Sequence, residues 1–244
     1  MLVIRSLALS SRLFSFSNTV APGELIHLAG PNGSGKSSLL ALLAGVLHGE
    51  GEVLLSGHLL ADWCGYALAC RRSYLSQQEQ RVAGMPVWHY LMLHNVNSSQ
   101  ERHSVLHHYV DALQLRDKLS RPLLQLSGGE WQRVRLAAAL FQIDQAQGQL
   151  LLLDEPLAGL DVAQQVAFDT LLPPLLARGV SIIMSSHDLN HTLHHAHRVW
   201  LLDKGTVVAT GTAEAVLVPD RLARVFGVIF RQAEFAGKSW LLPP

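Results

Sequence analysis

One short segment, Gly30–Ser37, restricts the fold of this chain more than any other part of it. Its sequence, GPNGSGKS, fits the pattern G-x-x-x-x-G-K-[ST], in which a loop wraps around a phosphate group. Glycines let the backbone turn tightly and point amide N–H groups at an anion, and the helix that follows adds the positive end of its dipole. Four fixed positions coincide by chance roughly once in a hundred chains of this length. The segment therefore predicts a loop that binds a nucleotide.

Within this loop, Lys36 supplies a full positive charge for the β- and γ-phosphates, and the Ser37 hydroxyl is placed to bind Mg²⁺. The residues that we expect to contact the nucleotide here are Gly30, Pro31, Asn32, Gly33, Ser34, Gly35, Lys36, Ser37 and Ser38.

The segments around the loop predict an α/β fold. A short apolar strand leads into the loop and a helix leaves it, as the phosphate-binding role requires. Further apolar strands alternate with helical patterns, which is typical of a largely parallel sheet. The expected strands are Leu2–Leu7 as an edge strand, Glu24–Leu28, Glu52–Leu55, Ser73–Leu75, Leu150–Leu153, Val180–Ser185, and the hairpin of Val199–Asp203 and Thr206–Thr210. The expected helices are Ser37–Val46, Gly128–Phe141, Val162–Leu176 broken by Pro173-Pro174, Thr212–Leu217 and Arg221–Phe226.

The pattern changes between Gln77 and Leu126, where strand signals end and amphipathic helical stretches begin. Helices are expected at Val87–Leu93 and Gln100–Leu115. We therefore expect a single domain over 1–244, with an α/β core from 1–76 and 127–244 and an inserted helical lobe from 77–126.

Two acids follow one of the apolar strands. Leu150–Leu153 delivers Asp154 and Glu155 at its carboxyl end, where ligands bind in open parallel sheets. We expect Asp154 to hold Mg²⁺ and Glu155 to polarise the water that attacks the phosphate. His187 follows Val180–Ser185 in the same manner and is placed to donate a hydrogen bond to the γ-phosphate.

Composition excludes several other functions. Lys and Arg together number 19 and so do Asp and Glu, so no basic surface for nucleic acid is indicated. The two cysteines are too few for a disulfide framework, and their spacing fits no metal motif. The N-terminus lacks the cleavage pattern of a signal peptide, and no run of about 18 apolar residues occurs, so a role at a membrane requires a membrane-spanning partner.

A second motif, Leu126–Arg133, narrows the class of nucleotide-binding protein. Its sequence, LSGGEWQR, resembles the LSGGQ-R signature of the ABC family, with Glu130 in place of the usual glutamine. The other motifs of that family occur in its order, namely the phosphate loop, Gln77 after a short strand, Ala158–Asp161 and His187. The resemblance covers nearly the whole chain.

The resemblance implies a fold, a reaction and partners. The fold is a P-loop NTPase core with a mostly parallel sheet, antiparallel edge strands and an inserted helical lobe. ATP and Mg²⁺ are the implied cofactors, with Ser37, Gln77 and Asp154 at the metal and Glu155, His187 and Gln77 as catalytic residues. Ser127, Gly128 and Gly129 face the γ-phosphate on a second copy of the chain, which implies a homodimer with two ATP molecules between its subunits. A polytopic membrane permease is the further partner, and the chain acts on the cytoplasmic face of the cell inner membrane.

Runs outside the catalytic minimum resemble one subfamily, the ATPases of the cobalamin (vitamin B12) importers of Gram-negative bacteria. These runs are Tyr74–Gln78, Pro86–Leu91, the signature run through Arg135–Ala138, and Met184–Leu193. This resemblance implies a periplasmic cobalamin-binding protein as another partner. The siderophore-iron importers are the alternative for the cargo. A soluble ABC ATPase that acts on DNA or ribosomes is disfavoured, because the interval between Lys36 and Ser127 is too short for a long coiled coil and the chain holds one cassette.

Several side chains have two interpretations. No aromatic residue clearly occupies the position upstream of the phosphate loop where many family members stack adenine. Arg12 could take that role by a cation–π contact, and Phe14 and Phe16 are expected in the core. Met85, Trp88 and Tyr90 fit either the core of the lobe or a groove for the permease, and we favour the groove. The histidines near the C-terminal third suggest a metal site, but a polar helix is the simpler expectation; they are His187, His191, His194, His195 and His197.

Overall fold

The computed structural model describes residues 1–77, 79–96 and 101–243. Its central element is a six-stranded sheet in the order β10-β9-β3-β8-β7-β6. Neighbouring strands from β9 through β3, β8 and β7 to β6 are parallel, whereas β10 pairs antiparallel with β9 at one edge. The strands are β3 (Leu25–Ala29), β6 (Arg72–Leu75), β7 (Leu150–Leu153), β8 (Ser181–Ser185), β9 (Arg198–Asp203) and β10 (Thr206–Gly211). The mostly parallel sheet with an antiparallel edge is confirmed.

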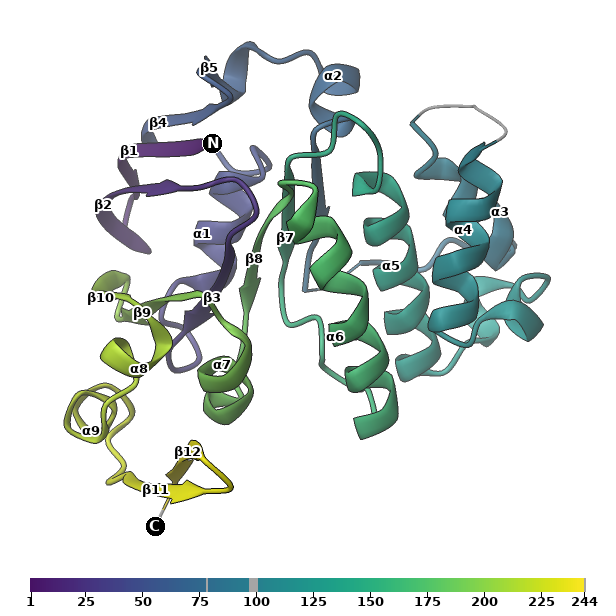
Figure 1. Ribbon diagram of the computed structural model, residues 1–244. Coiled ribbons are helices and arrows are strands. Elements are labelled where there is room, and N and C mark those ends of the chain that lie inside the picture. The colour runs from purple at the N-terminus through teal and green to yellow at the C-terminus, as the bar shows by residue number, and fades with distance from the viewer. Residues whose placement is uncertain (78, 97–100, 244) are drawn as a thin grey trace.

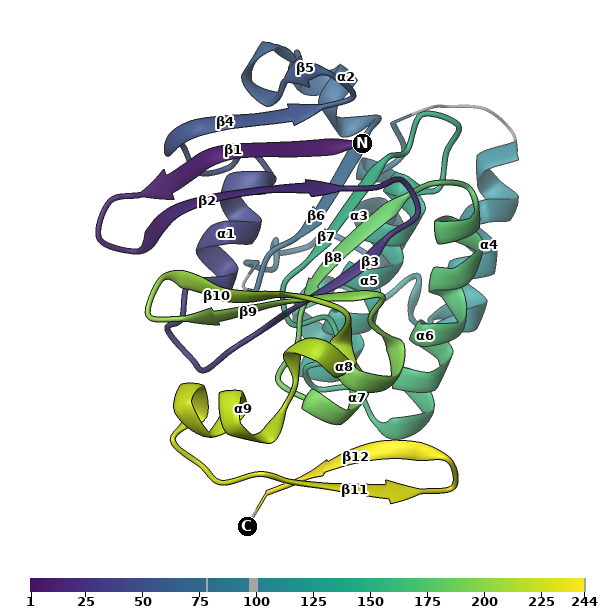
Figure 2. The same cartoon turned by 60° about the vertical axis from the view of Figure 1, so that its left-hand side comes forward.

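A second, antiparallel sheet runs in the order β2-β1-β4-β5. Figure 2 shows its strands as a separate layer above the main sheet. Its strands are β1 (Leu2–Leu9), β2 (Leu13–Val20), β4 (Glu50–Leu55) and β5 (His58–Leu59). The expectation of an edge strand at Leu2–Leu7 is wrong, because β1 is paired on both sides. Strand β2 was not expected. Its buried residues are Leu13, Phe16 and Val20, and Phe14 is 67% exposed instead of in the core.

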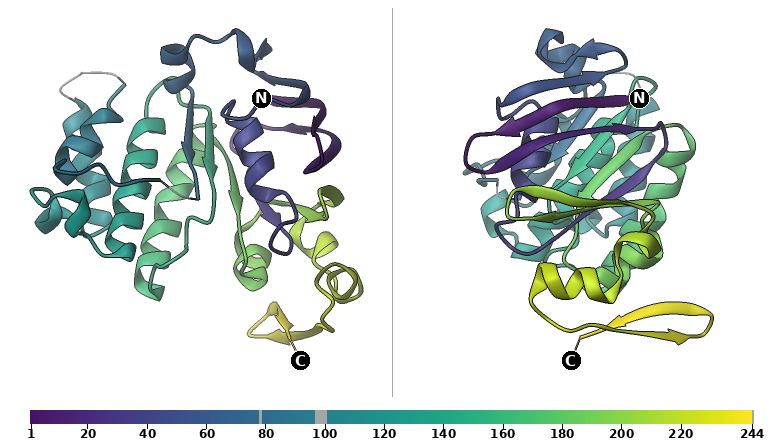
Figure 3. Two further views of the ribbon diagram at one scale, coloured as in Figure 1. Left: turned by 180° about the vertical axis from the view of Figure 1, so that it is seen from behind. Right: turned by 90° about the vertical axis from the view of Figure 1, so that its left-hand side faces the viewer.

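Helix α1 (Lys36–Leu43) fills the space between the two sheets, as the view from behind shows (Figure 3). Its leucines pack with Ile26 and Leu28 of β3 and with Trp200 of β9 in one apolar cluster. Phe16 meets Trp200 edge to face with ring centroids 5.0 Å apart, an arrangement that aromatic pairs prefer. This packing fixes the direction of α1, and with it the loop that begins the helix.

Helices α5 (Gly128–Ile143) and α6 (Val162–Ala177) contribute to the core on the other face of the main sheet. The expected break at Pro173-Pro174 is wrong, because α6 continues through both prolines to Ala177. Proline removes backbone donors and crowds the preceding turn. Here Leu171, Leu172 and Leu175 are buried on either side of the prolines, so tertiary packing holds the helix together.

The segment from 77 to 126 is helical in its described part. It contains α3 (Val87–Leu93), α4 (Glu101–Ala112) and two 3₁₀ turns at Arg116–Lys118 and Leu123–Gln125. Gln78 and Gln100, which belong to predicted segments, lie outside the described residues. Figure 1 shows α3 and α4 on the far side of α5, away from the sheets. Tyr90 is buried and Met85 is packed against the same cluster, so both belong to the core.

The C-terminal part packs against the β9–β3 end of the main sheet. It consists of α7 (Leu189–His195), α8 (Ala213–Val216), α9 (Pro219–Phe226) and a hairpin of β11 (Arg231–Phe235) and β12 (Lys238–Leu242). The hairpin was not expected from the sequence. The right-hand view of Figure 3 shows it beneath α9. The remaining helix, α2 (Gly65–Ala69), precedes β6.

One histidine is buried inside the main sheet. His27 of β3 has its Nδ1 3.1 Å from the Thr192 hydroxyl of α7, and its ring stacks on His191. Burial, with the nearby histidines as a smaller cause, lowers the pKa of His27 to about 3. The ring is therefore neutral at physiological pH.

No helix among the described residues has both the length and the apolar character needed to cross a membrane.

Candidate active site

A pocket of about 770 Å³ lies at the edge of the main sheet where four parallel strands end. The phosphate loop follows β3, Gln77 follows β6, Glu155 follows β7 and His187 follows β8. Ligands bind at this edge because loops after neighbouring parallel strands converge there. The lining residues are Ser11, Arg12, Asn32, Gly33, Gly35, Lys36, Ser37, Ser38, Gln77, Glu155, His187, Lys204 and Gly205.

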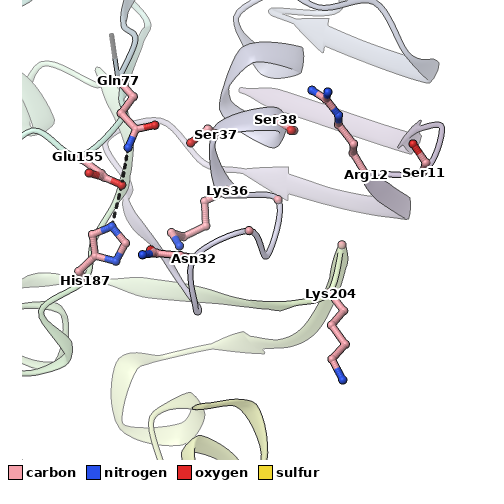
Figure 4. Close-up of a pocket in the computed structure, with 13 residues that line it drawn as sticks. Ser11, Arg12, Asn32, Lys36, Ser37, Ser38, Gln77, Glu155, His187 and Lys204 are labelled. Atoms are coloured by element: carbon pink, nitrogen blue, oxygen red, sulfur yellow. Dashed lines mark hydrogen bonds and ion pairs between the residues drawn. The ribbon is translucent and has the colours of Figure 1, made fainter. Parts of the chain in front are cut away.

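The phosphate loop folds around the Lys36 ammonium. Its Nζ donates to the carbonyl oxygens of Gly30 and Pro31 at 2.7 and 3.0 Å. Burial lowers the pKa of Lys36, while Glu155 and Asp154 act in the opposite direction. Gly35 caps α1 with φ 104°, a conformation that favours glycine. The loop thus presents one cation and the first turn of a helix to the pocket (Figure 4).

A hairpin turn supports this loop from the side. The Gly205 N–H donates to the Ser34 carbonyl at 3.0 Å, and the Gly205 carbonyl accepts from the Phe14 N–H at 2.8 Å. A Cβ on Gly205 would lie 2.7 Å from the Arg12 carbonyl oxygen, so the approach requires glycine. Sequence reasoning recognised the Lys204-Gly205 turn but gave it no place in the site. Only the tertiary contact reveals that role.

Gln77, Glu155 and His187 meet in one hydrogen-bonded group. The Glu155 Oε1 accepts from Gln77 Nε2 at 3.0 Å and from His187 Nε2 at 2.7 Å, and Figure 4 shows the three side chains converging. Glu155 has φ 50°, a left-handed conformation that costs a non-glycine residue roughly 1–3 kcal/mol. The Ser185 hydroxyl holds this backbone by accepting from the Glu155 N–H at 2.7 Å.

Asp154 lies beneath the pocket with 2% of its surface exposed. Its Oδ1 accepts from the Ser185 hydroxyl at 2.7 Å, and its buried Oδ2 has no hydrogen-bond partner among the described residues. A buried carboxylate oxygen without a partner is costly. Together with the Ser37 hydroxyl and the Gln77 amide, Asp154 forms an all-oxygen donor set, which is the kind that Mg²⁺ prefers. The residues present therefore fit a Mg²⁺ ion.

The other end of the pocket is lined by Ser11, Arg12 and Lys204 (Figure 4). No aromatic side chain lines the pocket in the described part of the chain. Arg12 thus lines the pocket, and its contact with adenine stays a prediction.

The signature residues lie outside this pocket. Ser127 begins α5 and its hydroxyl accepts from the Glu130 N–H at 3.2 Å, while the Glu130 carboxylate accepts from the Ser127 N–H at 2.8 Å. This reciprocal capping box fixes the start of the helix. The hydrogen bond from Ser127, followed by the pairing with Lys118, lowers the pKa of Glu130. Ser127, Gly128 and Gly129 do not line the pocket that holds Lys36.

Gly129 touches the loop that contains Gly159. A Cβ on Gly129 would lie 2.8 Å from the Gly159 carbonyl oxygen, whereas a Cβ on Gly128 meets no atom within 4 Å. We expect Gly129→Ala to destabilise the chain by about 1–3 kcal/mol, because backbone must move to admit the methyl group. Gly128→Ala is the matched control and should be neutral or stabilising by up to about 1 kcal/mol. Denaturant unfolding of both variants measures this, and equal stability of the two would contradict the contact.

The fold and the pocket define a P-loop ATPase. A family model described as ABC transporter matches residues 13–158, and the chain belongs to this family as an ATP-binding, ATP-hydrolysing cassette. A vitamin B12 import ATP-binding protein, BtuD, from Citrobacter koseri is 50% identical over 98% of this chain and 96% of the relative. BtuD from Escherichia coli O139:H28 is 51% identical over the same shares.

Solved structures share the fold. One described as the ATP-binding subunit of an ABC transporter has a TM-score of 0.81, with 24% identity and 93% of each chain covered. A dimeric cassette in a post-hydrolysis state, bound to ADP and Pi, has a TM-score of 0.77 with 22% identity over 87% of this chain and 99% of that one. The predicted family and fold are therefore confirmed.

Proposed function

We propose that this chain is the ATPase subunit of an importer for cobalamin, bound to the cytoplasmic face of the cell inner membrane. The observation that supports the cargo is the 50–51% identity with vitamin B12 import ATP-binding proteins over 98% of the chain. Such identity extends well beyond the phosphate loop and the signature, which every ABC importer needs.

We propose a role for each polar group at the phosphate end of the pocket. Lys36 and the amides at the start of α1 bind the β- and γ-phosphates. Glu155 orients the attacking water and takes up its proton, and Gln77 and His187 hold the carboxylate from two sides. In this proposal His187 also donates a hydrogen bond to the γ-phosphate. Ser37, Gln77 and Asp154 hold Mg²⁺, which neutralises charge on the β- and γ-phosphates when it is bound.

Two copies of the chain complete the site. Ser127 and the two glycines after it offer a hydroxyl and backbone amides at a helix start, which suits an anion. Their position outside the pocket of their own chain supports binding to the nucleotide of a second copy. We therefore propose a homodimer with ATP at both interfaces.

The membrane permease docks on the helical lobe in this proposal. Trp88 of α3 is 52% exposed and Leu93 is 60% exposed, and exposed apolar groups of this size mark contact sites when they gather. A cavity of about 620 Å³ is lined by Gln77, Glu79, Gln80, Arg81, Trp131, Gln132 and Arg135. Tyr90 does not line this cavity but supports it, since its hydroxyl donates to Glu79 at 2.9 Å and its ring packs on Trp131. Gln77 belongs to both this cavity and the ATP pocket, so a contact with the permease can reach the catalytic group.

Transport distinguishes the proposed cargo from its alternative. The chain is reconstituted in liposomes with its membrane subunit and the periplasmic cobalamin-binding protein, with ATP on the side of this chain. We expect ATP-driven cobalamin accumulation that Glu155→Gln abolishes. A complex that moves a ferric siderophore and not cobalamin would keep the importer function and overturn the cargo. Absence of any complex with a membrane subunit would favour a soluble ABC ATPase.

The dimer has its own test. In the Glu155→Gln background, which slows hydrolysis, ATP should convert monomers to dimers in light scattering. Adding Ser127→Arg should prevent this, because the long cationic side chain occupies the second anion site. Ser120→Arg, an exposed serine outside the signature, is the matched control and should still dimerise. A full ATP dimer of the Ser127→Arg variant would contradict the arrangement.

A further inference from the structure

A cluster of imidazoles and one carboxylate lies between α6 and α7, and none of its residues lines the ATP pocket. His191 and His195 are one helical turn apart on α7, and Asp169 reaches them from α6. One ligand atom of each of these three side chains lies within 4.8 Å of the other two. They line a pocket of about 290 Å³ together with His27 and His197.

The distances between ligand atoms in the cluster are close to those in a metal site. The His191 Nε2 lies 3.0 and 3.1 Å from the two Asp169 carboxylate oxygens. Ligands about 2.0–2.1 Å from a tetrahedral Zn²⁺ ion stand about 3.3 Å from one another. The His191 and His195 rings are stacked with centroids 4.3 Å apart, which keeps the two imidazoles side by side. His195 is exposed, and a change in its side-chain torsions can close the remaining gap without moving a helix.

Two nitrogens near the pocket lack hydrogen-bond partners. The His27 Nε2 and the His191 Nδ1 are both buried without a partner in the described part of the protein. His27 is fully buried and its ring lines the pocket. Buried polar atoms of this kind usually have a protein or solvent partner, so the pocket is built to hold something polar.

A simpler interpretation is that α7 is a polar helix, as the sequence led us to expect, and that Asp169 and His191 form a structural pair. That pair accounts for one contact only. It does not explain the second histidine within reach of the same carboxylate. The sequence could not include Asp169 in the cluster, because only the packing of α6 on α7 brings it there.

We propose that Asp169, His191 and His195 form a binding site for a divalent transition-metal ion of the Zn²⁺ class. Two histidines four residues apart on one helix are a recurrent Zn²⁺-binding pair, and a carboxylate from another element completes three protein ligands. The pocket leaves room for water as a fourth ligand. Imidazole nitrogen favours Zn²⁺, Ni²⁺ or Cu²⁺ over Mg²⁺, so the ion of the ATP pocket does not compete for this site.

The site connects two functional segments. Helix α6 follows the loop of Gly159, and α7 begins two residues after His187. A metal ion held by both helices therefore ties the two segments together.

Titration of the full chain tests the site. The protein carries no histidine tag, is freed of metal with a chelator and contains no nucleotide, because ATP itself binds Zn²⁺. We expect calorimetry to find one Zn²⁺ per chain in the presence of excess Mg²⁺, and Co²⁺ to give the visible absorption of a four-coordinate site. Zn²⁺ should also raise the thermal unfolding midpoint. His195→Ala and Asp169→Asn should each weaken binding by more than about tenfold.

His194→Ala is the matched control. His194 lies on the same helix, but its Nε2 pairs with the Ser239 carbonyl at 2.8 Å and points away from the cluster. This variant should retain the affinity of the unmodified chain. Circular dichroism confirms that each variant is folded. Absence of saturable Zn²⁺ binding would overturn the proposal. Affinity equal to that of the unmodified chain in the His195→Ala and Asp169→Asn variants would also overturn it, and so would a loss of the same size in His194→Ala.

Discussion

Glu155→Gln should bind ATP and hydrolyse it about 10²–10⁴-fold more slowly than the unmodified chain, the usual cost of losing a positioned general base. The amide keeps the size of the side chain and an oxygen that can accept the hydrogen bonds from Gln77 and His187. It removes the charge that takes up the proton from water. Steady-state phosphate release measures turnover, and calorimetry measures ATP affinity.

Glu214→Gln makes the same chemical change at an exposed position in the first turn of α8. Its turnover should equal that of the unmodified chain. Near-normal turnover of Glu155→Gln would move the role of the base to another residue. Lost ATP binding would instead indicate that the substitution had disturbed the pocket.

Lys36→Ala should weaken ATP binding roughly ten- to hundredfold and abolish turnover. A charge-assisted hydrogen bond contributes about 1.5–3 kcal/mol, and each 1.4 kcal/mol is tenfold in affinity. Lys36 is only 6% exposed, so in the unmodified chain little water competes with phosphate for its charge. Calorimetric titration with ATP and Mg²⁺ measures the loss.

Lys238→Ala, an exposed residue in the C-terminal hairpin, removes the same charge far from the pocket and should leave ATP affinity unchanged. Thermal unfolding must show that Lys36→Ala remains folded, because the substitution also removes the hydrogen bonds to Gly30 and Pro31. Unchanged ATP affinity in a folded Lys36→Ala variant would contradict the assignment of the phosphate loop.

The parts of the site that the sequence predicted are those where chemistry and local structure coincide. Gly30–Ser37 must be a loop between a strand and a helix to bind phosphate, and Leu150–Leu153 must end where its two acids are needed. Each is a short contiguous pattern that is compatible with few local structures. The structure brings Lys36, Gln77 and Glu155 to one pocket, as the order of the strands predicted.

What the sequence could not predict depends on contacts between distant segments. Nothing near Gly205 indicates that its backbone holds Ser34, and nothing near Asp169 indicates two histidines of α7. Pro173 and Pro174 were expected to break a helix on the basis of local propensity. That expectation is wrong because tertiary packing overrides propensity. Strand β2 was missed because its buried residues, Leu13, Phe16 and Val20, lie three and four positions apart and lack the alternation typical of a strand.

The contact between Gly129 and Gly159 links the two nucleotide sites of the proposed homodimer. In the proposed homodimer, Gly129 faces the nucleotide of the other copy, while Gly159 lies four residues after Glu155, which serves its own. Because a methyl group does not fit between the two glycines, a shift of one loop displaces the other. Occupancy of one nucleotide site then alters the affinity of the second, and thermodynamic linkage makes this influence equal in both directions. The two ATP molecules would then not bind independently, and the Hill coefficient for ATP binding should differ from one.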